Sequence, residues 1–169
     1  MAVAESAALL AALTLQRLVE LVVSRRNTQA LLARGGYEEG AAHYPVMVGF
    51  HATWLLTLWL FGWGHPLVWP FVIAAVVLQI GRFWVMRTLG ERWTTRIIIV
   101  PGSTPVTSGP FRFVRHPNYL IVALELPLIS LALGLVWHAV LFGALNLAML
   151  AWRIRSEDMA FARLPGART

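Results

Sequence analysis

The chain has 169 residues, 58% of them hydrophobic, and its 14 basic residues, all arginine, give a formal net charge of +6. A globule of this length cannot bury so much apolar surface inside itself, so the composition excludes an ordinary soluble domain. It favours one membrane-embedded domain over residues 1–169. The absence of cysteine excludes disulfides, thiolate metal sites and a cysteine nucleophile. The histidines are scattered, so no metal site is predicted.

Five apolar segments meet or approach the roughly 20 residues that a helix needs to cross the hydrocarbon core. They are residues 3–23, 44–63, 66–86, 119–136 and 137–151. The last two are short and meet near Gly134, which predicts a helical hairpin that need not cross the whole bilayer. The expected fold is therefore an all-α integral membrane protein of about five transmembrane helices. Three N-terminal spans occupy residues 1–88, and residues 89–169 hold a cytoplasmic loop, the hairpin and a C-terminal cytoplasmic helix.

The arginines alternate between the connections of these segments. Residues 24–43, residues 87–115 and the tail after Ala151 are rich in arginine, whereas residues 62–65 and 134–138 contain none. The positive-inside rule then places the N-terminus outside and the C-terminus in the cytoplasm. The same rule explains the net charge without a nucleic-acid partner. Residues 97–100 are β-branched and precede several prolines and glycines, which predicts a short extended segment.

Several polar residues fall inside the predicted spans, where a charge costs about 2.5–3.5 kcal/mol on insertion scales. Glu125 is either part of a substrate pocket or a neutral carboxylic acid that hydrogen-bonds to a neighbouring helix or to backbone carbonyls freed by Pro127. His51 is either a packing residue or a second substrate-binding group. Arg17 and Glu20 are three residues apart and are expected to pair on one helix face. Arg82 is expected to extend its side chain towards the cytoplasm.

Two polar constellations stand apart from these single residues. Residues 115–119 enter the fourth span with Pro117 near its first position, so their side chains gather at the positive end of a helix and suit an anionic or polar ligand. Arg153 and Glu157 are four residues apart and share one face if the last helix continues past the membrane. The hairpin brings both constellations to the same end. The alternative is an exposed basic stretch with a surface ion pair.

The segment Ser108-Gly-Pro-Phe-Arg-Phe-Val-Arg-His-Pro-Asn-Tyr119, two short spans and Arg153-x-x-x-Glu157 together resemble the isoprenylcysteine carboxyl methyltransferase family. The resemblance covers residues 95–164 and implies an S-adenosylmethionine-dependent membrane enzyme with a cytoplasmic cofactor-binding loop. It implies a substrate-handling role for Arg153. Arg115 is the second candidate catalytic arginine, because its guanidinium could also hold the carboxylate of a methyl acceptor. Phe111 replaces a tyrosine common in the family, which would keep stacking and lose a hydroxyl contact. The other implied cofactor contacts are His116, Pro117, Asn118, Tyr119, Glu157, Ser103, Thr104, Pro105 and Val106.

The chain also resembles compact bacterial members of this family, some of which O-methylate polyketide-derived phenolic lipids or alkylpyrones. Its arginine- and alanine-rich composition without lysine suggests a GC-rich bacterial genome, and hence the bacterial inner membrane. We therefore expect O-methylation of a lipophilic small molecule that reaches the site from the membrane lipids. Carboxyl methylation of a prenylcysteine-like substrate is the alternative. Phospholipid N-methylation, NADPH-dependent reduction and a non-catalytic scaffold stay open as other functions.

Overall fold

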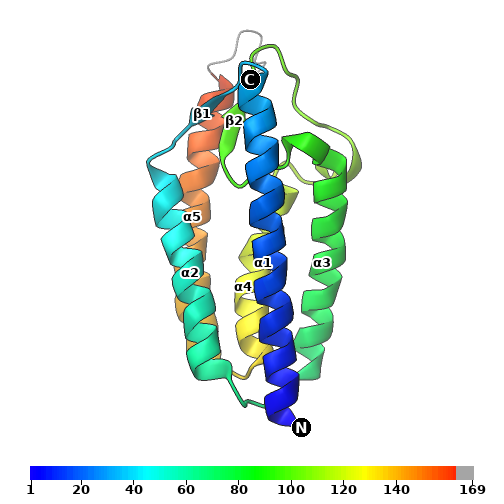
Figure 1. Cartoon of the computed structure of the whole chain (residues 1–169), viewed down its shortest axis with the longest axis vertical. Helices are drawn as coiled ribbons and strands as arrows, with labels where there is room; N and C mark the ends of the chain where they lie inside the picture. The colour runs from blue at the N-terminus through cyan, green and yellow to red at the C-terminus, as the bar shows by residue number, and fades with distance from the viewer. Residues whose placement is uncertain (163–169) are drawn as a thin grey trace.

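The computed structural model describes the backbone of residues 1–162 and the side chains up to Met159. The elements run in the order α1 (Ala2–Ala33), β1 (Tyr37–Glu39), α2 (His43–Gly62), α3 (Trp69–Leu89), η1 (Gly90–Arg92), β2 (Ile97–Ile99), η2 (Gly109–Arg112), α4 (Pro117–Ala132) and α5 (Val136–Ala162). The five α-helices of this part of the chain lie side by side and alternate in direction, and α4 lies behind α1 in the view of Figure 1. This confirms the predicted five-helix, all-α class.

Four helices in the described residues, α1, α2, α3 and α5, are long and apolar enough to cross a membrane. The fourth predicted span is shorter than expected, because the chain turns over Leu133, Gly134 and Leu135, with Gly134 at a φ of 70°. At about 1.5 Å per residue, the 16 residues of α4 extend about 24 Å, less than the hydrocarbon thickness of about 30 Å. The fifth predicted span, residues 137–151, forms the first part of α5, which continues without a break to Ala162, as the predicted C-terminal helix requires.

The outer surfaces of the long helices are apolar. Leu15, Leu60 and Ile80 leave most of their side-chain surface exposed on α1, α2 and α3. The backbone hydrogen bonds of each helix are satisfied internally, so such surfaces suit contact with lipid tails. Inside the bundle, one buried cluster includes Leu10, Trp54, Leu58, Leu126 and Leu133 and joins α1, α2 and α4.

The first helix continues ten residues beyond the predicted span, so the first half of the expected connection 24–43 is helical. The end of an apolar run marks the membrane boundary and not the end of a helix, and Arg, Gln, Ala and Leu in residues 24–33 favour helix in water as well. The helix ends before Gly35, at a φ of 82°. Asn27 ties this extension to the loop after α3, because its amide donates to the carbonyls of Gly90 at 3.2 Å and Trp93 at 2.7 Å.

A two-stranded antiparallel sheet covers the arginine-rich end of the bundle. The predicted extended segment is confirmed as β2, and its partner β1 was not predicted. Tyr37 lies opposite Ile99 in the strand pair. Arg96, just before β2, forms a salt bridge with Glu38 of β1, and its Nη1 lies 2.7 Å from both carboxylate oxygens. Arg163 and Arg168, which contributed to the predicted cytoplasmic charge of the tail, lie outside the described residues.

Candidate functional site

The polar site lies where the start of α4 meets the last turns of α5. His116 is the N-cap of α4 and Pro117 its first residue, as the sequence predicts. The turn after Ala132 reverses the chain, so α5 returns along α4 to the same end (Figure 1). Because α5 is one continuous helix, Arg153 and Glu157 lie one turn apart on the face that meets α4.

Tyr119 joins the two constellations directly. Its hydroxyl donates a hydrogen bond to Glu157 and accepts one from Nε of Arg153 at 3.0 Å. The Arg153 guanidinium carbon also lies 5.6 Å from the centroid of the Tyr119 ring. The convergence predicted from the hairpin is therefore confirmed, and we call Tyr119, Arg153 and Glu157 the Tyr119 cluster.

Arg153 is buried and held from two sides. Besides Tyr119, it contacts α2, where its Nη1 lies 2.8 Å from the sulfur of Met47. Its third nitrogen, Nη2, has no hydrogen-bond partner among the described residues. A guanidinium that is fixed through Nε and Nη1 and open at Nη2 is suited to hold one oxygen of a ligand.

The residues before Tyr119 form the outer wall of this site. The rings of His116 and Tyr119 stack with centroids 5.3 Å apart and planes 20° apart. His116 Nε2 and Arg115 Nη2 lie 3.5 Å and 3.1 Å from the same oxygen of Asp158. The side chain of Arg115 is 75% exposed, so this arginine lies at the rim. Asn118 Oδ1 is buried and has no hydrogen-bond partner in the described part of the chain, which leaves an acceptor for a ligand.

The upstream stretch does not touch the Tyr119 cluster through any contact of the described residues. Ser103, Thr104, Pro105 and Val106 lie in the loop between β2 and η2. The hydroxyl of Ser103 donates to the carbonyl three residues earlier at 2.7 Å, and Arg92 Nη1 donates to the carbonyl of Thr104 at 2.7 Å. Their cofactor-binding role stays a prediction of the resemblance.

Phe111 packs in the apolar layer behind the site, against a buried cluster that includes Val85 and Trp93. Its predicted stacking role therefore stays a prediction as well. The backbone conformation explains why glycine stands at position 109 of the motif 108–119. Gly109 has a φ of 57°, and a Cβ at this position would lie 2.6 Å from Oγ1 of Thr88, so a larger residue would strain the turn into η2.

A second polar cluster lies deeper, among α1, α3 and α4. Glu125 is fully buried and pairs with Arg82 and, at 2.5 Å, with Nη2 of Arg17. Gln79 donates to its other oxygen at 2.6 Å. The interpretation of Glu125 as a neutral acid is wrong, because two guanidinium groups, which keep their charge in proteins, bind its carboxylate. Both carboxylate oxygens of Glu125 already have partners within the protein. Its substrate-binding role stays a prediction.

The predicted pair of Arg17 and Glu20 is confirmed at 2.7 Å and belongs to this cluster. The expectation that Arg82 extends to the cytoplasm is wrong. Its side chain is 4% exposed and lies 3.3 Å from Glu20 as well as against Glu125. We call Arg17, Glu20, Arg82 and Glu125 the charge network. Its two positive and two negative charges compensate each other within the bundle, so the side chain of Arg82 does not need to extend to the membrane surface.

His51 lies one helical turn from Met47, and its Nδ1 is 2.9 Å from the Met47 carbonyl. It is therefore on the face of α2 that reaches Arg153, and its substrate-binding role stays a prediction. His138, which was not predicted as a polar contact, is fully buried at the opposite end of the bundle. Its Nε2 and Nδ1 lie 2.9 Å and 2.8 Å from the hydroxyls of Thr57 and Ser130. The position of this histidine among apolar residues, beside the hairpin turn, was the sequence feature that could have indicated its burial.

Comparison with known proteins places this arrangement in a family. Residues 71–163 match the model of the isoprenylcysteine carboxyl methyltransferase (ICMT) family. An uncharacterized protein of Bacillus subtilis, YpbQ, is 40% identical over 157 residues, which are 90% of this chain and 94% of that protein. An uncharacterized protein of Haemophilus influenzae is 27% identical over 157 residues, 88% of this chain and 90% of that protein. No solved structure matches. The chain therefore belongs to the isoprenylcysteine carboxyl methyltransferase family of membrane methyltransferases.

Proposed function

We propose that the protein transfers the methyl group of S-adenosylmethionine to an oxygen of a lipophilic small molecule of the phenolic-lipid or alkylpyrone type. The observation that carries the proposal is the Tyr119 cluster, in which a buried arginine is oriented by two neighbours and keeps one nitrogen without a partner among the described residues. Family membership supports methyl transfer, and enzymes of this family generally use S-adenosylmethionine.

The residues at the entry of α4 fit the polar groups of this cofactor. Its ribose hydroxyls and ammonium group need acceptors, which the carboxylate of Glu157 and the unpaired Oδ1 of Asn118 offer. Its carboxylate needs donors or cations, which Arg115 and His116 offer at the helix N-terminus. The cofactor supplies an electrophilic methyl group on a sulfonium sulfur.

Arg153 is the residue that we assign to the methyl acceptor. Its Nη2 would hold the acceptor oxygen, while Tyr119 and Met47 fix the plane of the guanidinium. A positive charge beside a phenol or enol lowers its pKa, so the acceptor loses its proton to water and reacts as the oxyanion, which is the nucleophile. A carboxylate acceptor is already ionised and has no proton to lose. The remaining contribution of the protein is alignment of the acceptor oxygen with the methyl group. Arg115, exposed at the rim, is the second candidate.

The apolar part of the acceptor would enter from the bilayer between helices, past the face of α2 that carries Met47 and His51. By the positive-inside rule, the cofactor end of the bundle faces the cytoplasm of a bacterial cell and the N-terminus faces outwards. Carboxyl methylation of a prenylcysteine-like substrate fits the family equally well, because Arg153 would hold a carboxylate in the same way. A cationic amine, as in later steps of phospholipid N-methylation, would be repelled by Arg153.

Two measurements test the proposal. The detergent-purified protein is titrated calorimetrically with S-adenosylhomocysteine and with NADPH, and we expect binding of the first alone. Failure to bind S-adenosylhomocysteine, or binding of NADPH alone, would refute a methyltransferase. Transfer of a radiolabelled methyl group is then followed into an alkylresorcinol, an alkylpyrone and a prenylated cysteine. Product formation from the prenylated cysteine alone would refute O-methylation of a phenolic lipid and support carboxyl methylation of a prenylcysteine-like substrate.

Arg153→Ala tests the assignment of the acceptor site, with Arg155→Ala as the matched control on the exposed side of the same helix. We expect Arg153→Ala to bind S-adenosylhomocysteine normally and to lose at least about tenfold in turnover, the effect of one lost charge-assisted hydrogen bond. Arg155→Ala should keep both. Unchanged turnover in Arg153→Ala would move the acceptor contact to another residue, with Arg115 next.

A further inference from the structure

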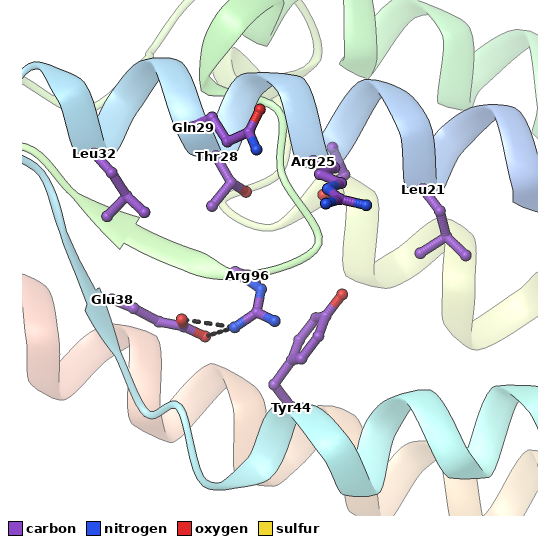
Figure 2. Close-up of a pocket in the computed structure, with 9 residues that line it drawn as sticks. Leu21, Arg25, Thr28, Gln29, Leu32, Glu38, Tyr44 and Arg96 are labelled. Carbon is purple, nitrogen blue, oxygen red and sulfur yellow. Dashed lines mark hydrogen bonds and ion pairs between the residues drawn. The ribbon is translucent and has the colours of Figure 1, made fainter.

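A cavity of about 490 Å³ lies at the arginine-rich end of the bundle, apart from the Tyr119 cluster, none of whose residues lines it. One wall is α1, from Leu21 to Leu32. Figure 2 shows the residues that face this helix: Tyr44 of α2 points towards α1, while Glu38 of β1 and Arg96 point towards each other.

The cavity is at the height where α1 leaves the hydrocarbon. The 32 residues of α1 extend about 48 Å, whereas the hydrocarbon core is about 30 Å thick, or about 20 residues of helix. Counted from Ala2, the helix reaches the polar boundary near Leu21. The half-exposed apolar side chains of Leu21 and Leu32 line the same cavity as charged and hydroxyl groups, so it has both an apolar and a polar lining.

The described residues that line the cavity carry one positive charge in excess. Its charged lining residues are Arg25, Arg96 and Glu38. Arg96 is neutralised by Glu38, with Nη1 2.7 Å from both oxygens, and its guanidinium lies 3.9 Å from the centroid of the Tyr44 ring. Arg25 has no ion pair or hydrogen bond of its side chain among the described residues, so its charge is available to a ligand.

Thr28, one turn after Ser24 on the same wall, adds an unpaired donor. The hydroxyls of Thr14, Thr53, Thr57 and Thr88 each donate to the carbonyl four residues earlier, at 2.7 to 2.9 Å. That of Thr28 does not, and its Oγ1 is buried without any hydrogen-bond partner in the part of the chain that the structure describes. A buried hydroxyl without a partner is uncommon and marks a place where a ligand atom completes the bonding.

We propose that this cavity binds the phosphate head group of an anionic membrane lipid, whose acyl chains run down the apolar face of α1. Arg25 supplies the charge and Thr28 a hydrogen bond, while Leu21 contacts the start of the acyl chains. Basic residues next to a membrane span attract anionic lipids in general, and the cavity adds a fixed shape and a donor that a bare surface lacks. Lipid binding here is independent of the methyl-transfer reaction.

The test uses the full-length protein, stripped of lipid in detergent and titrated with phosphatidylglycerol or phosphatidylcholine, with bound lipid counted by native mass spectrometry. We expect one phosphatidylglycerol to bind more tightly than the rest. Arg25→Gln should weaken it about tenfold or more, and Thr28→Val, which removes only the hydroxyl, about threefold to tenfold. Arg26→Gln is the matched control, since it removes the same charge from the next position of α1 but does not line this cavity.

Three outcomes would overturn the proposal. Equal weakening by Arg25→Gln and Arg26→Gln would mean that the charge of the surface, and not the cavity, attracts the lipid. Equally tight binding of phosphatidylcholine would show that the site does not select an anionic head group. Displacement of the tight lipid by millimolar glycerol 3-phosphate or inorganic phosphate would identify a soluble phosphate as the ligand. If Arg25→Gln fails to fold, as judged by its circular dichroism, Thr28→Val decides, and wild-type affinity in that variant would contradict the assignment.

Discussion

Replacing Glu125 by glutamine should strongly destabilise the protein, because the substitution keeps the shape of the side chain and removes one of four mutually compensating charges. Glu125 is fully buried and holds both Arg82 and Arg17. Without its charge, the network contains two arginines and only Glu20, and therefore one uncompensated buried positive charge. Breaking a buried pair in this way costs about 3–5 kcal/mol. At roughly 2–4 °C per kcal/mol for a chain of this size, the midpoint of thermal unfolding should fall by about 6–20 °C.

The assay is thermal denaturation in one detergent at one scan rate, followed by circular dichroism. Glu91→Gln is the control, because Glu91 pairs with Arg34 at 2.6 Å while both side chains are more than half exposed, and such a pair contributes at most about 1 kcal/mol. The double variant Glu125→Gln/Arg82→Gln restores the balance of charge and should unfold at a higher temperature than Glu125→Gln alone. A decrease for Glu125→Gln no larger than for Glu91→Gln would refute the reasoning.

Three further substitutions test the site and its scaffold. Glu157→Ala should abolish binding of S-adenosylhomocysteine in a calorimetric titration, and wild-type affinity would remove this carboxylate from the cofactor site. Tyr119→Phe keeps the ring and loses the hydroxyl that orients the neighbouring arginine, so turnover should fall about threefold to tenfold while the midpoint of unfolding changes little; equal turnover would contradict that positioning role. Gly109→Ala should lower the free energy of unfolding by about 1–2 kcal/mol because of the left-handed backbone conformation, and further because of the contact with Thr88. Gly143→Ala is the control, since its methyl group would have an ordinary contact distance of 3.7 Å, and this variant should unfold near the wild-type temperature.

The helices and the meeting of the two polar constellations were predictable because each rests on a local rule. Apolar runs of about 20 residues give spans, and the alternation of arginine gives their directions. Once α4 and α5 form a hairpin, residues 115–119 and the pair Arg153 and Glu157 come to the same end of the bundle. The contacts of Tyr119 with Arg153 and Glu157 also depend on how the two helices are rotated, which these rules do not predict.

The charge network, apart from its pair of Arg17 and Glu20, was not predictable from such local rules. Its members come from α1, α3 and α4, and their contact depends on the rotation of three helices about their own axes. Helices that are apolar on nearly all sides carry little sequence signal for that rotation, so neither Arg82 nor Glu125 could be assigned its partner residues. The strand β1 escaped prediction because three residues, Tyr37–Glu39, are too short for a periodic pattern and depend on β2 as a partner.

The charge network has a consequence for the site, because α4 carries residues of both. Glu125 lies six residues after Tyr119, which is about 120° around the helix, so the two side chains point to different neighbours. Glu125 binds α1 and α3, while Tyr119 meets Arg153 and Glu157 of α5. A helix of 16 residues with a proline inside it, at Pro127, has few features of its own to fix its rotation. The ion pairs of Glu125 fix that rotation from one side, and in doing so they direct Tyr119 towards α5. The buried charges are therefore best understood as the support that orients the helix on which the Tyr119 cluster depends.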